Sequence, residues 1–122
     1  MNILVVEDDP TSMKLVYIVL ENEGFHVTRV THPDDALDVV RQVKPDTILM
    51  DLALPTMDGL ELTRLLKKDP ATGHIPVIAI TSFPDHFPEK EAIRAGCDAY
   101  ILKPIDTRTL ATVVREVGHA NS

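Results

Sequence analysis

The chain alternates short apolar runs with segments of helical periodicity five times over, and this alternation constrains the fold more than any other feature. Short apolar runs bounded by turn residues are typical of strands. Strict alternation of strand and helix predicts a parallel sheet that has helices on both faces. The expected strands are NILVV, FHVTRV, TILM, PVIAI and AYIL, at residues 2–6, 25–30, 47–50, 76–80 and 99–102.

The residues of the predicted strands indicate which strands lie at the edge of the sheet and which lie in its centre. FHVTRV alternates apolar and polar residues, as expected of a half-exposed edge strand, whereas TILM is wholly apolar and fits a strand that is covered on both faces. Five strands connected in this way favour the order 2-1-3-4-5. We therefore expect an α/β, flavodoxin-like, doubly wound (βα)5 fold with a five-stranded parallel sheet.

Cap residues and prolines set the helix boundaries. Asp9 can cap a helix that begins at Pro10, Asp58 can cap the helix of GLELTRLLKK, and Asp106 can cap the last helix. The prolines of SFPDHFPEK, residues 82–90, are expected to shorten or unwind the first turn of the fourth helix. The expected helices lie at about residues 10–23, 33–44, 59–68, 88–95 and 107–118.

Length and charge limit the class of protein. The 122 residues fit one domain, expected to span residues 1–122, and show no linker or repeat. A net charge of −7 argues against direct nucleic-acid binding, which needs a basic surface. The N-terminal apolar stretch is too short for a signal peptide or a membrane span, so we expect a cytoplasmic protein with no membrane partner. One cysteine, Cys97, excludes an internal disulfide.

Polar residues follow the central strands of the predicted sheet. Sites in such folds form at the carboxyl ends of the strands, at the point where the strand order reverses. We expect the side chains there to lie close together, because parallel strands end at the same edge. They are Glu7, Asp8 and Asp9 after the first strand, Asp51 after the third, Thr81 and Ser82 after the fourth, and Lys103 and Pro104 after the fifth.

The charges at this edge call for a cation or for protons. Glu7, Asp8 and Asp51 would repel one another at short range, which disfavours their ionised forms. All the candidate ligands are oxygens and no histidine pair has metal-binding spacing, so zinc fits poorly. Mg²⁺ fits, with Mn²⁺ as a substitute, because it binds through a few carboxylates and phosphate oxygens. Lys103 and Thr81 add an ammonium and a hydroxyl that can hold a phosphoryl group.

Four motifs at the strand ends, ILVVEDD, ILMDLALPTMDGLEL, IAITS and AYILKPI, occur in this order over nearly the whole chain. Together they resemble the receiver domain of bacterial two-component response regulators. The resemblance implies that Asp51 accepts a phosphoryl group. It also implies that Glu7, Asp8, Asp51 and the backbone carbonyl of Ala53 bind Mg²⁺.

The resemblance further implies partners and a switch. A sensor histidine kinase or a histidine phosphotransfer protein would donate the phosphoryl group, and Thr81 and Lys103 would contact it on Asp51. Thr81, Ser82 and Tyr100 would be the switch residues, acting on the surface of the fourth helix, fifth strand and fifth helix. An unidentified downstream protein would bind that surface, and phosphorylation-dependent dimerisation is left open. The bond before Pro104 would be cis, and the protein would be a switch with slow autodephosphorylation rather than an enzyme.

Two positions near the acceptor bear on the lifetime of the phosphoryl group. In the family these are the residues two after the acceptor and two after the switch threonine, here Ala53 and Phe83. Neither side chain can hydrogen-bond a water molecule, so we expect a longer lifetime than in fast-cycling chemotaxis regulators. Phe83 and Phe87 are expected either to plug the core, which is slightly favoured, or to form an apolar patch for a partner.

The remaining reactive residues are expected to be structural. Cys97 is predicted to be a small buried hydrophobic residue. The histidines are scattered, and we expect them on the surface or in loops. They are His26, His32, His74, His86 and His119.

Three other functions are open to a chain of this kind. A Mg²⁺-dependent phosphohydrolase with an aspartyl-phosphate intermediate would need an acid two residues after Asp51, where this chain has Ala53. A flavin carrier would need a glycine- or hydroxyl-rich phosphate loop, where this chain has EDD. The third is a receiver fragment of a DNA-binding regulator or hybrid kinase. Because GHANS ends the chain just past the last helix, we expect a stand-alone receiver instead.

Overall fold

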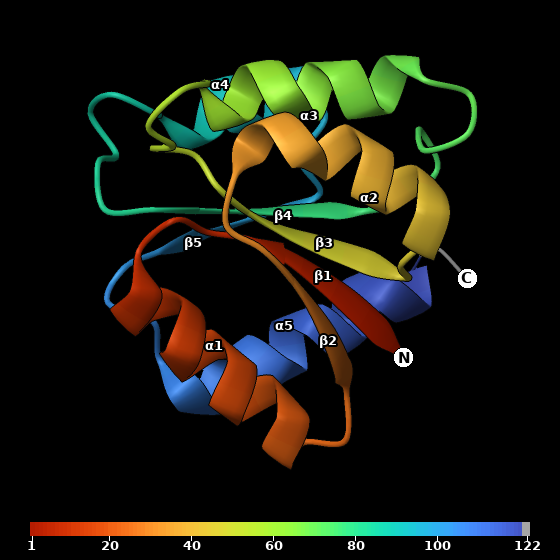
Figure 1. Cartoon of the computed structure of the whole chain (residues 1–122). Helices are drawn as coiled ribbons and strands as arrows, with labels where there is room; N and C mark the ends of the chain where they lie inside the picture. The colour runs from red at the N-terminus through yellow and green to blue at the C-terminus, as the bar shows by residue number, and fades with distance from the viewer. Residues whose placement is uncertain (121–122) are drawn as a thin grey trace.

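A five-stranded parallel sheet lies between two layers of helices in the computed structural model of the chain (Figure 1). The structure describes residues 1–120, with the side chains of residues 1–118. The strand order is β2-β1-β3-β4-β5, which confirms the predicted order. The strands are β1 (Asn2–Val6), β2 (His26–Val30), β3 (Thr47–Asp51), β4 (Val77–Thr81) and β5 (Ala99–Leu102).

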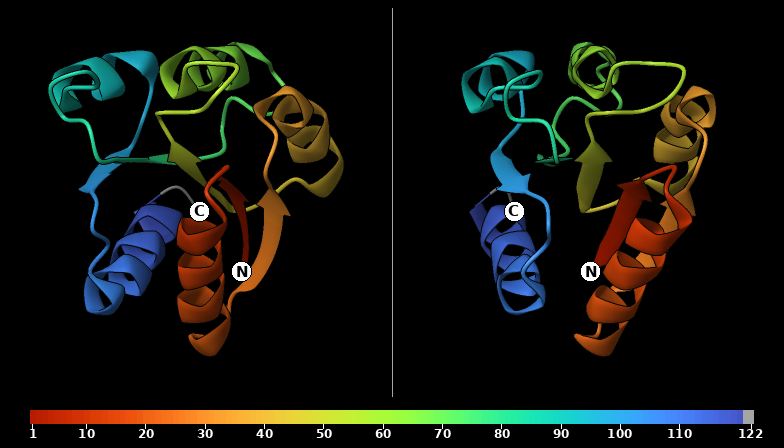
Figure 2. Two further views of the ribbon diagram at one scale, coloured as in Figure 1. Left: turned by 60° about the vertical axis from the view of Figure 1, so that its left-hand side comes forward. Right: turned by 90° about the vertical axis from the view of Figure 1, so that its left-hand side faces the viewer.

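The helices fall into two layers, one on each face of the sheet. α1 and α5 cover one face, and α2, α3 and α4 cover the other (Figure 2). No helix in the described part of the chain is long and apolar enough to cross a membrane. The helices are α1 (Pro10–Asn22), a 3-10 turn η1 (Pro33–Asp35), α2 (Ala36–Val43), α3 (Gly59–Lys68), α4 (Glu89–Ala95) and α5 (Thr107–Ala120).

The central strands are apolar at successive positions because both sheet faces are buried. Leu4 and Val6 of β1 pack toward α2 and α3, whereas Ile3 and Val5 pack toward α1 and α5. All five residues of β3 are buried. This double coverage leaves the strand ends as the places in the sheet where polar side chains can gather.

The predicted caps are present. The side chain of Asp9 accepts a hydrogen bond from the Ser12 amide at 2.9 Å, and that of Asp58 accepts one from the Leu60 amide at 2.7 Å. Asp106 accepts from the Arg108 amide at 2.9 Å.

Several element boundaries differ from the prediction by one to three residues; β4, for example, runs from Val77 to Thr81 and not over residues 76–80. The second helix was predicted to begin at Pro33, but its first turn is 3-10, and α2 begins at Ala36. The third strand was predicted to end at Met50, but Asp51 still pairs with Ile80 of β4 and so belongs to β3. α4 is short and begins after Pro88, as the prolines of its loop predict.

Side-chain burial settles several smaller expectations. Cys97 is buried, as predicted, and His26, His32, His74 and His86 are exposed. The side chain of His119 lies outside the described residues. Phe87 packs against the core, but Phe83 is 55% exposed, so the preference for Phe83 in the core was wrong. The loop that contains Phe83 begins at the carboxyl end of β4 and places this side chain outside the core.

Candidate functional site

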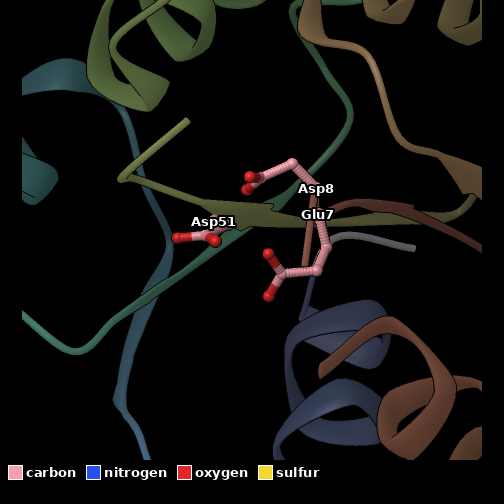
Figure 3. A group of neighbouring side chains, drawn as sticks. All are labelled: Glu7, Asp8 and Asp51. Atoms are coloured by element: carbon pink, nitrogen blue, oxygen red, sulfur yellow. The ribbon is translucent and has the colours of Figure 1, made fainter. Parts of the chain in front are cut away.

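Three carboxylates meet at the carboxyl ends of two adjacent strands. Glu7 and Asp8 follow β1, and Asp51 ends β3, its hydrogen-bonded neighbour. One oxygen from each carboxylate lies within 4.8 Å of the others, and Figure 3 shows the three side chains around one space. The predicted meeting of these residues therefore occurs in the structure.

The three acids differ in exposure. The Glu7 residue is 4% exposed and Asp51 is 6% exposed, whereas Asp8 is exposed. Two charges thus lie inside the protein and one lies at the mouth of the site. Buried carboxylates need partners, since burial of an unpaired charge is costly.

Lys103 supplies a cation to the buried pair. Its ammonium nitrogen lies 2.7 Å from Oε1 of Glu7 and 3.4 Å from Oδ2 of Asp51, and its side chain is 17% exposed. A cis peptide bond joins Lys103 to Pro104, as the family resemblance implies.

Backbone amides hold the other oxygens of the same two carboxylates. The Ala53 amide donates to Oδ1 of Asp51 at 3.1 Å, and the Asp9 amide donates to Oε2 of Glu7 at 3.2 Å. Each buried carboxylate therefore faces an amide with one oxygen and Lys103 with the other. These contacts orient Asp51 at the end of its strand.

The surroundings of Glu7 and Lys103 raise the pKa of both groups. Burial, a hydrogen bond to Asp51 and the charge of Asp51 raise the pKa of Glu7 to about 7, against the lowering effect of Lys103. Burial lowers the pKa of Lys103, but its hydrogen bond to Glu7 and the charge of Asp51 outweigh burial, so its pKa is raised. Lys103 therefore stays charged, while Glu7 binds a proton more readily than an exposed glutamate.

The donor set fits a hard divalent cation. All three side-chain donors are carboxylates, which are ligands that Mg²⁺ prefers. The Lys103 ammonium pairs with Glu7 and Asp51, two of the three carboxylates, so negative charge remains uncompensated when all three are ionised. Burial is the main cause of the raised pKa of Glu7, and a bound cation would offset the further contribution that comes from the charge of Asp51.

The two predicted switch residues on β4 and β5 both bond to the loop that precedes α4. The buried hydroxyl oxygen of Thr81 accepts the Phe83 amide at 2.9 Å, and the Tyr100 hydroxyl donates to the Phe87 carbonyl at 2.5 Å. Ser82 is exposed beside them. Residues 82–88 are thus tied at one end to β4 and at the other to β5.

Gly59 is a site residue that the sequence interpretation missed. A β-carbon at this position would lie 2.5 Å from the carbonyl oxygen of Asp51 and 2.6 Å from the Cα of Leu52. The start of α3 therefore packs directly on the backbone that carries the acceptor candidate. The available signal was the glycine directly after the cap Asp58, a position where helix propensity disfavours glycine.

A family comparison decides the class of protein to which this site belongs. Residues 3–115 match the family model described as the response regulator receiver domain. The chain belongs to this family. Receiver domains are signalling switches of two-component systems that interact with histidine kinases or phosphotransfer proteins and with downstream targets, and they bind Mg²⁺ in their acidic site.

Individual relatives also support the assignment of the chain to the receiver-domain family. The chain is 41% identical over 120 residues to the polar-differentiation response regulator DivK of Brucella anthropi, covering 98% of each chain. A CheY-like receiver domain protein from Methanospirillum hungatei superimposes with a TM-score of 0.90 at 28% identity, over 98% of this chain and 94% of that one.

A third relative bears on the metal. The receiver domain of a sensor histidine kinase from Pseudomonas aeruginosa superimposes with a TM-score of 0.88 at 28% identity, over 97% of each chain. That structure has a magnesium ion coordinated in its active-site cleft.

Proposed function

We propose that this receiver, taken as residues 1–122, accepts a phosphoryl group on Asp51 from the histidine of a sensor histidine kinase or a phosphotransfer protein. The observation that carries the proposal is the place of the Asp51 carboxylate. It ends the central strand β3, is nearly buried, and lies beside Glu7, Asp8 and the Lys103 ammonium. A carboxylate held in this way is a preoriented nucleophile.

The surroundings of Asp51 suit phosphoryl transfer. An oxygen of Asp51 would form a bond to phosphorus as the bond from phosphorus to the donor's imidazole nitrogen breaks. Lys103, already within reach of Asp51, would offset charge on the phosphoryl oxygens, and the Thr81 hydroxyl would donate to one of them. The reaction thus draws on positioning and electrostatics rather than on a general base.

We assign the metal ligands to Glu7, Asp8, Asp51 and the backbone carbonyl of Ala53, with Mg²⁺ as the ion and Mn²⁺ as a substitute. The clustering of the three carboxylates supports this assignment. When bound, the ion would stabilise the charge that develops on the phosphoryl oxygens. Exposed Asp8 would bring the metal to the mouth of the site, where a donor can approach.

A hollow beside Lys103 supports the approach of a phosphodonor. It has a volume of about 350 Å³ and lies between α1 and the β5–α5 loop, lined among others by Ser12, Leu15 and Pro104. Leu15 is 40% exposed, so an apolar side chain on α1 is available to a partner. A donor helix placed there would present its histidine toward Asp51.

Output would follow from the contacts of the β4–α4 loop. As the Thr81 hydroxyl turns toward the phosphoryl group, its hydrogen bond with the Phe83 amide would break or carry the loop with it. Tyr100 would respond because its hydroxyl holds the Phe87 carbonyl at the other end of that loop. Phosphorylation would thereby favour one of two conformations of the α4–β5–α5 surface, where Ile93 and Leu102 are each half exposed.

We expect the phosphoryl group to be long-lived. Ala53 and Phe83 line one cavity beside Asp8, and neither side chain can orient a water molecule for hydrolysis. Autodephosphorylation would therefore be slow, and a lifetime of seconds in a radiolabel decay assay would contradict this expectation.

Phosphotransfer profiling tests the proposed function. Purified histidine kinases, labelled on their histidine with radioactive phosphate, are mixed with the receiver and Mg²⁺. We expect rapid label transfer from a cognate kinase, complete loss of transfer in Asp51→Asn, and none when the metal is chelated. Asp58→Asn is the matched control, since asparagine preserves the helix cap in the same loop. Transfer to the Asp51→Asn variant would disprove the assignment of the acceptor.

A further inference from the structure

A groove runs along the flank of α1 that faces the edge strand β2, away from the β5–α5 loop. Its volume is about 520 Å³. Its apolar lining includes Met13, Tyr17 and Ile18 of α1, and Ile18 is 44% exposed. Figure 1 shows α1 lying beside β2, the outermost strand of the sheet. The groove reaches the proposed metal site only at Asp8, which also lines it, and the proposed phosphotransfer uses none of the α1 side chains on this flank.

Arg29 is held in the groove by an aromatic ring. Its guanidinium carbon lies 4.4 Å from the centroid of the Tyr17 ring, a cation–π contact. Arg29 lies on the same side of β2 as Val27, the side that packs toward α1. The ring orders the guanidinium while leaving its N–H groups free to donate in the plane of the group.

The groove carries a local excess of positive charge on an acidic protein, because two cations, Lys14 and Arg29, and one carboxylate, Asp8, line it. Among the described side chains, neither Arg29 nor Lys14, the two cations that line it, has a carboxylate partner. Arg115 provides the contrast, because it also lies over a ring, that of Phe25, but is paired with Glu23 at 2.8 Å. Since the whole chain has a net charge of −7, a groove lined by two cations and one carboxylate is a local reversal of sign.

We propose that the α1–β2 groove, defined by Met13, Lys14, Tyr17, Ile18 and Arg29, is a second docking surface for an acidic, amphipathic helix of a partner protein. The apolar side chains would bury the partner's apolar face, and Lys14 and Arg29 would bind its carboxylates. Methionine, tyrosine and arginine are also the residues enriched at the centres of protein interfaces. The groove includes no residue of α4, β5 or α5, so a partner bound there would leave that surface open.

Two synthetic helical peptides with the same leucine face test this surface, one with glutamates and one with lysines at the polar positions. Each is titrated into the isotope-labelled receiver while backbone amide resonances are recorded by NMR. We expect the glutamate peptide to shift resonances of Tyr17, Ile18 and Arg29, and the lysine peptide to bind at least about fivefold more weakly.

Variants separate binding from folding. Arg29→Gln and Lys14→Gln should each lower the affinity of the receiver for the glutamate peptide by about fivefold, and Arg115→Gln should leave that affinity unchanged. Lys14 is exposed and unpaired, so its variant keeps the test valid even if Arg29→Gln loses stability.

Other results would overturn the proposal. They include no binding of either peptide, equal binding of both, shifts confined to α4, β5 and α5, and an Arg115→Gln effect as large as that of Arg29→Gln. Shifts of the groove resonances that depend on protein concentration in the absence of peptide would indicate that a second copy of this chain binds there. Shifts caused by vesicles of anionic lipid would indicate that the groove binds a membrane.

Discussion

The Lys103 ammonium bonds the buried carboxylate of Glu7 at 2.7 Å, although 96 positions separate the two residues. This contact joins the end of β5 to the end of β1 across the sheet edge. Asp51 lies between them in the strand order but is farther from the ammonium, at 3.4 Å. Without metal, Lys103 is therefore held chiefly by Glu7, and a cation bound by the acids would compete for the same carboxylate.

Replacing Lys103 should destabilise the domain. Lys103→Gln leaves two nearly buried carboxylates without a cation, which is expected to lower the free energy of unfolding by about 1–3 kcal/mol at pH 8. The loss should be smaller at pH 5, where Glu7 can bind a proton. Urea denaturation at both pH values measures the effect. Arg108→Gln, which breaks an exposed pair with Asp106, should cost less than about 0.5 kcal/mol.

Stability in the absence of divalent metal should fall as pH rises from about 4.5 to about 7. The folded state raises the pKa of Glu7 from 4.5 to about 7, so it binds the proton more tightly than the unfolded chain does. This contribution is complete below the unfolded pKa and is lost as pH passes the folded one. Melting temperatures across this range should decline, and Glu7→Gln should flatten the decline. A wild-type melting temperature that rises over this window would contradict the prediction.

Mg²⁺ should raise the melting temperature more at pH 8 than at pH 5, because the metal competes with protons for the acid cluster. Thermal melts with and without Mg²⁺ at the two pH values measure the difference. Asp51→Asn should reduce the Mg²⁺ effect at pH 8, since it removes one of the three carboxylates. An equal Mg²⁺ effect at both pH values would count against a carboxylate site.

Gly59→Ala should damage both the fold and the metal site. Helix propensity alone favours alanine by about 1 kcal/mol, but the new β-carbon would press on the backbone of Asp51 and Leu52. We expect a net loss of about 2 kcal/mol in unfolding free energy and weaker Mg²⁺ binding. Gly24→Ala is the control, because a β-carbon there meets no atom within 4 Å and the cost comes from its φ of +89°. That variant should lose stability but bind Mg²⁺ normally.

Removal of the Tyr100 hydroxyl should loosen the β4–α4 loop. Tyr100→Phe deletes the hydrogen bond to the Phe87 carbonyl, worth about 1 kcal/mol. Amide hydrogen exchange at His86 and Phe87 should accelerate about fivefold. The Leu52 amide, bonded to Ile80 between the central strands, should keep its rate. Uniform acceleration of all three amides would show a global rather than a local effect.

A side chain that binds water near the acceptor should shorten the phosphoryl lifetime. Ala53→Asn introduces an amide beside Asp51, and one added hydrogen bond to an attacking water should speed hydrolysis by about fivefold. Ala53→Val, which adds bulk without a polar group, should not shorten the lifetime. Decay of the radiolabelled protein measures both variants, and faster decay of the valine variant would show that access rather than hydrogen bonding sets the rate.

Much of the fold was predictable because its signals are local. The apolar runs of β1 and β5 and the caps Asp9 and Asp58 each depend on a few neighbouring residues, and the structure has them where predicted. The first turn of the second helix was not predicted as 3-10, because nothing in PDD distinguishes that turn from an α-helical one. The exposure of Phe83 also escaped prediction, since the path of a loop depends on the elements that it joins.

The order of residues along the chain was enough to place Glu7, Asp8, Asp51, Thr81 and Lys103 at one sheet edge, because parallel strands in a known order end together. What each group does there depends on distances between strands that no local pattern encodes. Packing buries Glu7 and leaves Asp8 exposed, and it brings Lys103 closer to Glu7 than to Asp51. The close approach of Gly59 and the pairing of Arg29 with Tyr17 arise in the same way, from helices docked on a sheet.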